Sequence, residues 1–230
     1  MSDETRIILN NITGAYQLGA DKADYTHVNK YPSNTSLSQF LNDQCIMHTS
    51  LILYYKSILE FKQLDVEDQI LLIKCNLMNI IHLHYIILQN FQENPKIGEH
   101  MSKWIAPEFH QQMEKTRRYS YRFTKHPLLL KLTLIIFIFS TSLSIPEGSG
   151  KFNGYNHRKK LSQCQNHYTT VLWNYLTHLF DEKDAIRAMQ VIVAQILRYQ
   201  QLMVVLKQVV ENQSMHDTLH ALMQSIFGFS

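Results

Sequence analysis

Apolar residues recur every three to four positions over most of this 230-residue chain, and that spacing places them on one face of a helix. The pattern predicts helices at about 2–17, 36–59, 68–90, 107–123, 127–144, 157–180 and 184–211, followed by a short amphipathic helix within 217–229. Polar residues, Gly and Pro interrupt the pattern at 19–36, 91–107 and 146–154, so we predict loops there. If the chain holds any β-structure, we expect one short hairpin around 91–107.

The scarcity of turn-forming residues supports an all-α fold. The chain has 7 Gly and 5 Pro, whereas average usage would give roughly 16 and 12. So few turns exclude a many-stranded sandwich or barrel and favour long helices with few connections. We therefore expect a single domain over 1–230, with a first helix at 1–18, a loop at 19–36, a helical core at 37–211 and a terminal helix at 217–229.

Charge and cysteine content exclude several classes of protein. With 22 Lys or Arg against 19 Asp or Glu, the net charge of +3 is too small to indicate a nucleic-acid-binding surface. Cys45, Cys75 and Cys164 have no paired spacing, so we expect neither a disulfide framework nor a zinc module, and a reducing compartment is the simplest interpretation. We find no pattern of a secretory signal at the N-terminus. The apolar stretch 128–145 contains Lys131, so we predict a buried helix there and no membrane association.

Motifs that carry catalytic chemistry are missing. The sequence has no Gly-rich phosphate loop, no Gly-x-Ser-x-Gly and no His-Glu-x-x-His. His216 and His220 are four residues apart, but no third ligand accompanies them, so a solvated pair is the better interpretation than a metal site. An all-α enzyme of lipid metabolism would need clustered carboxylates on facing helices, which the sequence does not indicate. We expect no enzymatic activity and no cofactor.

The segment from Tyr54 to Lys74, YYKSILEFKQLDVEDQILLIK, carries the most specific pattern. It resembles the signature of nuclear-receptor ligand-binding domains, aromatic-x-Lys-x(4)-Phe-x-x-Leu-x(3)-Asp-Gln-x-x-Leu-Leu-Lys. The Pro that usually precedes Gly-Phe is absent, because Leu59 and Glu60 occupy that place. Other parts of the chain are similar to the vitamin D and pregnane X receptor group, with an invertebrate-like divergence: residues 3–8 with 15–16, 168–176, 185–187 and 197–198. Residues 222–228 resemble the activation helix of this group, Leu-Val-Leu-Glu-Val-Phe-Gly.

This resemblance implies a three-layer antiparallel α-helical sandwich that acts as the ligand-regulated switch of a nuclear transcription factor. We expect it in the nucleus, or in both cytoplasm and nucleus. DNA contact would need a separate module, because the family's DNA-binding module uses eight zinc-ligating cysteines and this chain has 3. The alternative function is a ligand-independent orphan or repressor-type domain for interaction and dimerisation, with its pocket filled by its own side chains.

A pocket for a small lipophilic molecule follows from the resemblance. Gln44 and His48 interrupt an apolar stripe, where a buried polar group costs about 1–3 kcal/mol unless it is hydrogen-bonded. His84 stands where the family generally carries an Arg, so a carboxylate ligand is not expected. The alternative is that these residues are ordinary core. The expected lining is Leu37, Phe40, Leu41, Gln44, Met47, His48, Met78, Ile81, His84, Tyr85, Leu88, Met203 and Leu206.

The resemblance also implies a groove for coregulator peptides of the Leu-x-x-Leu-Leu type. The lysines at its edge would meet the C-terminal carbonyls of the partner helix. Ser225 replaces the Glu that caps the partner's N-terminus in the family, so we expect weakened recruitment. The alternative is that Lys56 and Lys74 are ordinary surface lysines. The expected groove is Lys56, Ile70, Leu71, Ile73, Lys74, Leu222, Met223, Ser225 and Phe227.

The helix predicted at 184–211 has two apolar stripes. The resemblance implies that one of them forms a dimer surface, with a retinoid X receptor-like partner or with a second copy of the chain. The expected interface is Met189, Ile192, Val193, Ile196, Tyr199 and Met203, and the second stripe is Ile186, Val193, Leu197 and Val204. Complete burial of this helix within one domain is the alternative.

Overall fold

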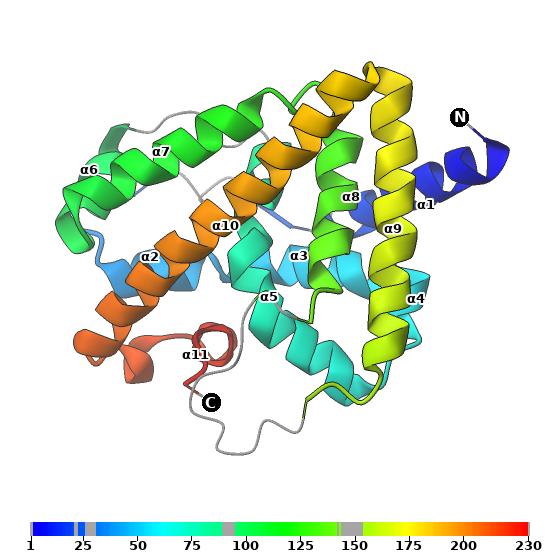
Figure 1. The fold of residues 1–230 in the computed structure, drawn as a ribbon. Coiled ribbons are helices and arrows are strands. Elements are labelled where there is room, and N and C mark those ends of the chain that lie inside the picture. Colours follow the sequence, from blue (N-terminus) through cyan, green and yellow to red (C-terminus); the bar gives the residue numbers. More distant parts are fainter. Residues whose placement is uncertain are drawn as a thin grey trace.

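The computed structural model describes residues 2–20, 23–25, 31–88, 95–141, 143 and 154–229, and all regular structure within them is helical (Figure 1). The helices are α1 (Asp3–Ala20), α2 (Leu37–Asp43), α3 (Cys45–Ser57), α4 (Leu59–Lys62), α5 (Val66–Ile87), α6 (Pro95–Trp104), α7 (Pro107–Tyr121), α8 (Pro127–Ile138), α9 (Arg158–Leu179), α10 (Glu182–Asn212) and α11 (Ala221–Phe227), with a 3-10 turn at His216–Thr218. The predicted all-α class is confirmed for these residues.

Helices α5 and α8 form the centre of the molecule. They pack against each other, and α8 is buried along almost its whole length. Helices α1 and α3 pack together and cover α8 and α5, respectively. On the other side, α10 crosses the molecule diagonally against α7, α5 and α9, and α11 packs on α5 (Figure 1). Burial on all sides explains the largely apolar sequence of α8, in which Lys131 and Thr133 are the polar residues, and at 12 residues the helix is too short to span a bilayer.

Helix α1 packs directly against the backbone of α3 at one glycine. Ser2 caps α1 by accepting a hydrogen bond from the Thr5 backbone N–H, at 3.2 Å. At the other end, a Cβ on Gly19 would lie 2.8 Å from both the Ser50 carbonyl oxygen and the Tyr54 backbone nitrogen. A residue with a side chain would push the two helices apart, so Gly19 sets the separation of α1 and α3.

Buried polar side chains on α5 fix the neighbouring segments. The Asp68 carboxylate accepts hydrogen bonds from the backbone N–H groups of Asn156 and His157, which attaches the start of α9 to the start of α5. The Asn76 side-chain amide donates to the carbonyls of Ile138 and Ser140, at 2.8 Å each, and so satisfies the end of α8. These bonds position α5 relative to both α8 and α9.

Several predicted boundaries are wrong. The single helix expected at 36–59 divides at Gln44 into α2 and α3 and ends at Ser57. The hairpin expected around 91–107 is replaced by α6 over residues 95–104, and residues 91–94 lie outside the described part. The helix at 127–144 ends at Ile138, and the 217–229 helix is a 3-10 turn followed by α11. Most of the loop predicted at 146–154 lies outside the described residues.

Among the described helices, α5 and α10 are long and apolar enough to cross a membrane by length and composition alone. In the most apolar part of α5, 61% of the residues are buried inside the protein, as in the core helix of a soluble domain. In α10 the corresponding share is 39%, because one apolar stripe faces outward. This outward stripe is part of the candidate site described next.

Candidate functional site

The side chains predicted to line a ligand pocket lie inside the molecule, on α2, α3, α5 and α10. Nine of them are buried: Leu37, Leu41, Gln44, Met47, His48, Ile81, His84, Met203 and Leu206. The others are partly buried: Phe40, Met78, Tyr85 and Leu88. The structure therefore places the set in the interior, and the hydrogen bonds of its polar members determine what they can offer to a ligand.

The ring of His84 is hydrogen-bonded on both sides by residues of other helices. Its Nδ1 lies 2.7 Å from the Tyr16 hydroxyl of α1, and its Nε2 lies 2.8 Å from the Ser50 hydroxyl of α3. Since Ser50 donates to the Met47 carbonyl at 2.9 Å, it accepts from Nε2–H, and Tyr16 donates to Nδ1. Burial raises the pKa of Tyr16 well above its usual range, which keeps this hydroxyl a donor. His84 thus joins three helices and presents no unsatisfied ring nitrogen to a ligand.

Gln44 is also satisfied by protein groups. Its side-chain amide donates to the Tyr31 hydroxyl at 2.7 Å, and its carbonyl oxygen accepts from the Tyr85 hydroxyl. His48 donates from Nδ1 to the Gln44 main-chain carbonyl at 2.9 Å, which leaves its buried Nε2 as an acceptor without a hydrogen-bonding partner in the described structure. Of these two predicted ligand contacts, only His48 retains a polar atom for a ligand.

Three buried histidines are held in the neutral form. Burial lowers the pKa of His48 to about 4, with a smaller opposing effect of its hydrogen bond to the Gln44 carbonyl. Burial likewise lowers the pKa of His82 and of His84 to about 3, and proximity to His48 adds to the shift of His84. The His82 ring stacks on Tyr199 of α10 with the ring centres 4.1 Å apart. The interior between α3, α5 and α10 therefore disfavours positive charge.

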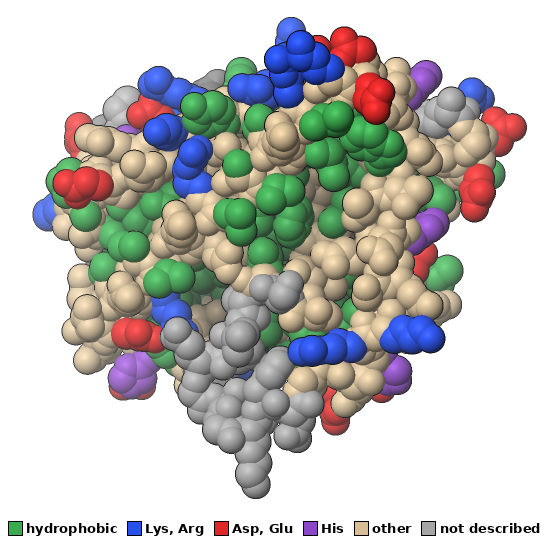
Figure 2. Space-filling model, viewed as in Figure 1, with side chains coloured by type: hydrophobic (Ala, Val, Ile, Leu, Met, Phe, Trp, Pro, Cys, Tyr) green, Lys and Arg blue, Asp and Glu red, His purple; other side chains and the backbone are tan. Residues whose placement is uncertain are grey.

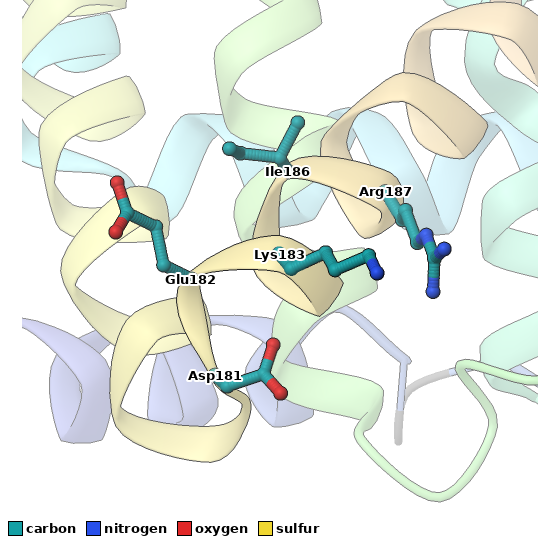
Figure 3. A pocket seen from close by; sticks show the side chains of 5 residues that line it. All are labelled: Asp181, Glu182, Lys183, Ile186 and Arg187. Carbon is teal, nitrogen blue, oxygen red and sulfur yellow. The ribbon is translucent and has the colours of Figure 1, made fainter.

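Two hollows lined by described residues lie away from this interior. One, of about 590 Å³, opens over the first turns of α10, beside Asp181, Glu182, Lys183, Ile186 and Arg187. Figure 3 shows Glu182 extending away from Lys183 and Arg187, so these charges do not converge on one point. The other, of about 330 Å³, lies between the start of α1 and the end of α9. Neither is lined by a residue that was predicted for the ligand pocket, although Ile186 of the first hollow belongs to the second apolar stripe of α10.

The predicted coregulator groove is placed partly on the surface and partly in the core. Lys56 is exposed and Ile70 is 49% exposed, while Leu71, Ile73, Lys74, Leu222 and Ser225 are intermediate. Met223 and Phe227 are each 1% exposed, so these two side chains hold α11 against the core instead of facing a peptide. Leu53 and Val66, which the sequence did not single out, add exposed apolar surface on α3 and α5.

Asn42 attaches the C-terminal segment to α2 through both ends of its side-chain amide. Its nitrogen donates to the Thr218 carbonyl at 3.0 Å, and its oxygen accepts from the His220 backbone N–H at 2.7 Å. The ring of His220 in turn accepts from the Leu222 N–H and caps α11. This contact was missed because Asn42 and Thr218 are 176 residues apart and neither belongs to a sequence motif.

His216 and His220 do not share a helix, because His216 belongs to the 3-10 turn and His220 precedes α11. Within the described residues, no group of three His, Cys, Asp or Glu side chains could hold a metal ion.

Helix α10 has an inward and an outward apolar face. Four residues expected at a dimer interface are buried within this chain: Ile192, Ile196, Tyr199 and Met203. Met189 is intermediate, and Val193 is exposed. An interface formed by the four buried residues would require α10 to leave the core, so the candidate contact surface is the second stripe. We name this set the α10 stripe: Ile186, Val193, Leu197 and Val204, each more than 40% exposed.

A scan of protein-family models finds no match to the chain, and a search of curated proteins finds none either.

Proposed function

We propose that this chain is a transcription-regulating interaction domain of the nuclear-receptor ligand-binding type, with its helices in three antiparallel layers. It binds a helical coregulator segment on the surface formed by α3, α5 and α11. One observation carries this proposal. The terminal helix α11 packs on α5, the helix that begins within the signature-like segment 54–74.

The exposed residues of this surface suit a Leu-x-x-Leu-Leu helix. Leu53, Val66 and Ile70 offer apolar surface on α3 and α5 on which the leucines of a partner can be buried. Lys56 is in the last turn of α3, where its charge can meet the C-terminal carbonyls of the partner. Ser225 of α11 supplies a hydroxyl and no negative charge for the partner's N-terminus, so one half of the electrostatic contact is missing.

The internal hydrogen bonds favour a form that needs no ligand. Both ring nitrogens of His84 and both ends of the Gln44 amide have protein partners. Met223 and Phe227 bury α11 against the core, and Asn42 holds the segment before it. These contacts support an α11 that is docked by the chain's own residues.

A second candidate is regulation by a small lipophilic ligand, and His48 is the observation that favours it. Its buried Nε2 is an acceptor without a partner in the described structure, and leaving such an atom unsatisfied costs about 1–3 kcal/mol. A sterol-like alcohol could donate a hydrogen bond to this atom. Native mass spectrometry with a sterol and bile-alcohol library tests this candidate, since a retained alcohol that is lost in His48→Phe would support it. Absence of any retained alcohol would leave the ligand-independent form as the function.

Association through the α10 stripe is the third part of the proposal. The stripe presents apolar side chains along a helix of 31 residues, which suits a parallel or crossed helix of a retinoid X receptor-like partner or of a second copy.

Titration of a fluorescent Leu-x-x-Leu-Leu peptide tests the proposed function. We expect micromolar binding to the wild type, at least tenfold weaker binding to Ile70→Asp, and unchanged binding to the control Ile7→Asp, which places a charge at an exposed apolar position of α1. Ser225→Glu should bind about 2- to 5-fold more tightly, because a carboxylate at the peptide's N-terminus adds about 0.3–1 kcal/mol. Binding that is equal in the wild type and in Ile70→Asp would rule out this surface.

A further inference from the structure

The outward side of α7 carries a row of cations. Lys115, Arg118, Arg122 and Lys125 follow one another at steps of three, four and three residues and are all exposed. This spacing puts neighbouring side chains on one face of a helix, about 5–6 Å apart at Cβ. Arg122 caps the end of α7 in a right-handed helical conformation, and Lys125 lies in the turn that follows the helix. We name these four residues the α7 row.

Negative charge is scarce within the segment that forms the α7 row. Residues 115–125 contain five Lys or Arg and no Asp or Glu. Glu114 pairs with Arg118, and no described residue forms an ion pair with Lys115, Arg122 or Lys125. In α10, Glu182 and Asp184 lie at the start and Glu211 lies near the end, and Asp184 pairs with Arg187 at 3.2 Å. Figure 2 shows Lys and Arg side chains over α7 and the adjoining start of α10, where Asp and Glu side chains lie beside them.

Two exposed tyrosines flank the α7 row. Tyr119 is 39% exposed, and Tyr121 is 68% exposed. The guanidinium of Arg122 lies 5.9 Å from the centre of the Tyr119 ring, and that of Arg198, from α10, lies 5.4 Å from the same centre. These cation–π contacts join α7 and α10 and hold two guanidinium groups at the surface. The ring of Tyr121 has most of its surface open to solvent.

We propose that the α7 row, with Tyr119 and Tyr121, binds single-stranded nucleic acid. Arginine binds phosphate through paired N–H donors, and an exposed aromatic ring stacks on an unpaired base. At helical spacing Lys115, Arg118 and Arg122 span roughly 10–12 Å, and Lys125 extends the row into the following turn, which suits about three to four nucleotides of one strand. A duplex would leave Tyr121 without a base to stack on. The surface uses no residue of α3, α5 or α11, so it is independent of the proposed function.

The net charge of +3 does not indicate this basic surface, because net charge does not report how charges cluster along the chain. Nearly a quarter of the 22 basic residues fall within the 11 residues 115–125, and acidic residues elsewhere balance them. Local potential at a surface depends on that clustering, since charges beyond about 8–10 Å are screened at physiological salt.

An acidic protein segment would also be attracted to these cations, but it would make no use of the exposed tyrosine rings. The experiment therefore separates charge from stacking.

Fluorescence anisotropy with labelled dT12 and U12 oligonucleotides tests the proposal. Four phosphate contacts give a slope of log affinity against log salt of about −3, or about 50-fold weaker binding at 200 mM than at 50 mM salt. Arg118→Gln combined with Arg122→Gln should reduce the slope to about half, whereas the control pair Arg158→Gln and Lys159→Gln at the start of α9 should leave it unchanged. Circular dichroism of each variant confirms that it is folded.

Tyr121→Ala distinguishes a nucleic acid from an acidic protein. We expect affinity for dT12 to fall about tenfold with the salt slope unchanged, because stacking is lost and phosphate contacts remain. A poly-glutamate competitor of equal charge should displace the oligonucleotide only weakly. Three results would overturn the proposal: no binding at 50 mM salt, equal slopes for the two charge variants, or a Tyr121→Ala variant that binds as the wild type does while poly-glutamate competes fully. The last result would assign the surface to an acidic protein segment.

Discussion

Three buried histidines should make the stability of this protein strongly dependent on pH. His48, His82 and His84 remain neutral in the folded chain because burial lowers their pKa to about 4, 3 and 3. In the unfolded chain each titrates near its usual value of about 6.5. Between pH 6.5 and 4 the unfolded chain therefore binds more protons than the folded chain, and the free energy of unfolding decreases as the pH falls. Above pH 7 these residues contribute no pH dependence.

The magnitude follows from the size of the shift. One pKa unit corresponds to 1.36 kcal/mol, so at pH 5 each buried histidine lowers stability by about 2 kcal/mol relative to pH 7.5. The three together lower it by about 6 kcal/mol, which is comparable to the total stability of many domains. We therefore expect the free energy of unfolding, measured by urea titration, to fall steeply below pH 6 and the protein to be close to unfolding at pH 5.

His82→Phe is the variant that isolates one of the three. A phenyl ring can keep the stacking on Tyr199, whose ring centre is 4.1 Å away, and His82 Nε2 has no hydrogen-bonding partner in the described structure that the change would remove. The variant should lose about 2 kcal/mol less stability than the wild type between pH 7.5 and pH 5. His178→Phe, at an exposed position of α9, serves as the control and should follow the wild-type curve. If the free energy of unfolding of His82→Phe depended on pH as that of the wild type does, buried neutral His82 would not be a cause of the pH dependence.

Three further predictions concern packing, the terminal helix and association. Gly19→Ala should destabilise the protein by about 1–3 kcal/mol, because a Cβ there would lie 2.8 Å from backbone atoms of α3. The control Gly14→Ala, which has nothing within 4 Å of its Cβ, should stabilise the protein by up to about 1 kcal/mol. Equal melting temperatures for the two variants would contradict the close packing of α1 on α3. Asn42→Ala removes two hydrogen bonds to the segment before α11, so amide hydrogen exchange at 216–227 should become about 5-fold faster. Exchange as slow as in the wild type would show that burial of α11 is sufficient to hold it in place. Leu197→Glu places a charge in the middle of the α10 stripe, where Leu197 is 52% exposed. In sedimentation experiments this variant should be monomeric, whereas the control Ile7→Glu should still form dimers. A monomeric wild type would refute self-association through the stripe.

The helical character of the chain and much of its core could be predicted from apolar spacing. That spacing is a local property, and Leu41, Met47 and Leu206, three of the residues predicted to line a pocket, are buried. It could not tell which of the two apolar stripes of α10 faces inward. Both have helical periodicity, and only the packing of α10 on α5 and α7 buries Ile192 and Ile196 while leaving Val193 and Leu197 outside.

The hydrogen-bonding partners of the candidate site could not be predicted. His84 bonds to Tyr16 and Ser50, which are 68 and 34 residues away, and no spacing rule relates them. The break at Gln44 is also a tertiary effect, because its side chain is held by Tyr31 and Tyr85. The sequence therefore suggested polar groups available to a ligand, and the structure satisfies most of them internally.

Hydrogen–deuterium exchange with and without a saturating Leu-x-x-Leu-Leu peptide tests whether the surface formed by α3, α5 and α11 binds a coregulator helix. We expect slower exchange at 53–57, 66–74 and 221–227, the parts of α3, α5 and α11 that form the proposed surface, with no change in α7. Protection confined to α10, or an identical exchange pattern with and without peptide, would contradict a coregulator surface on these helices.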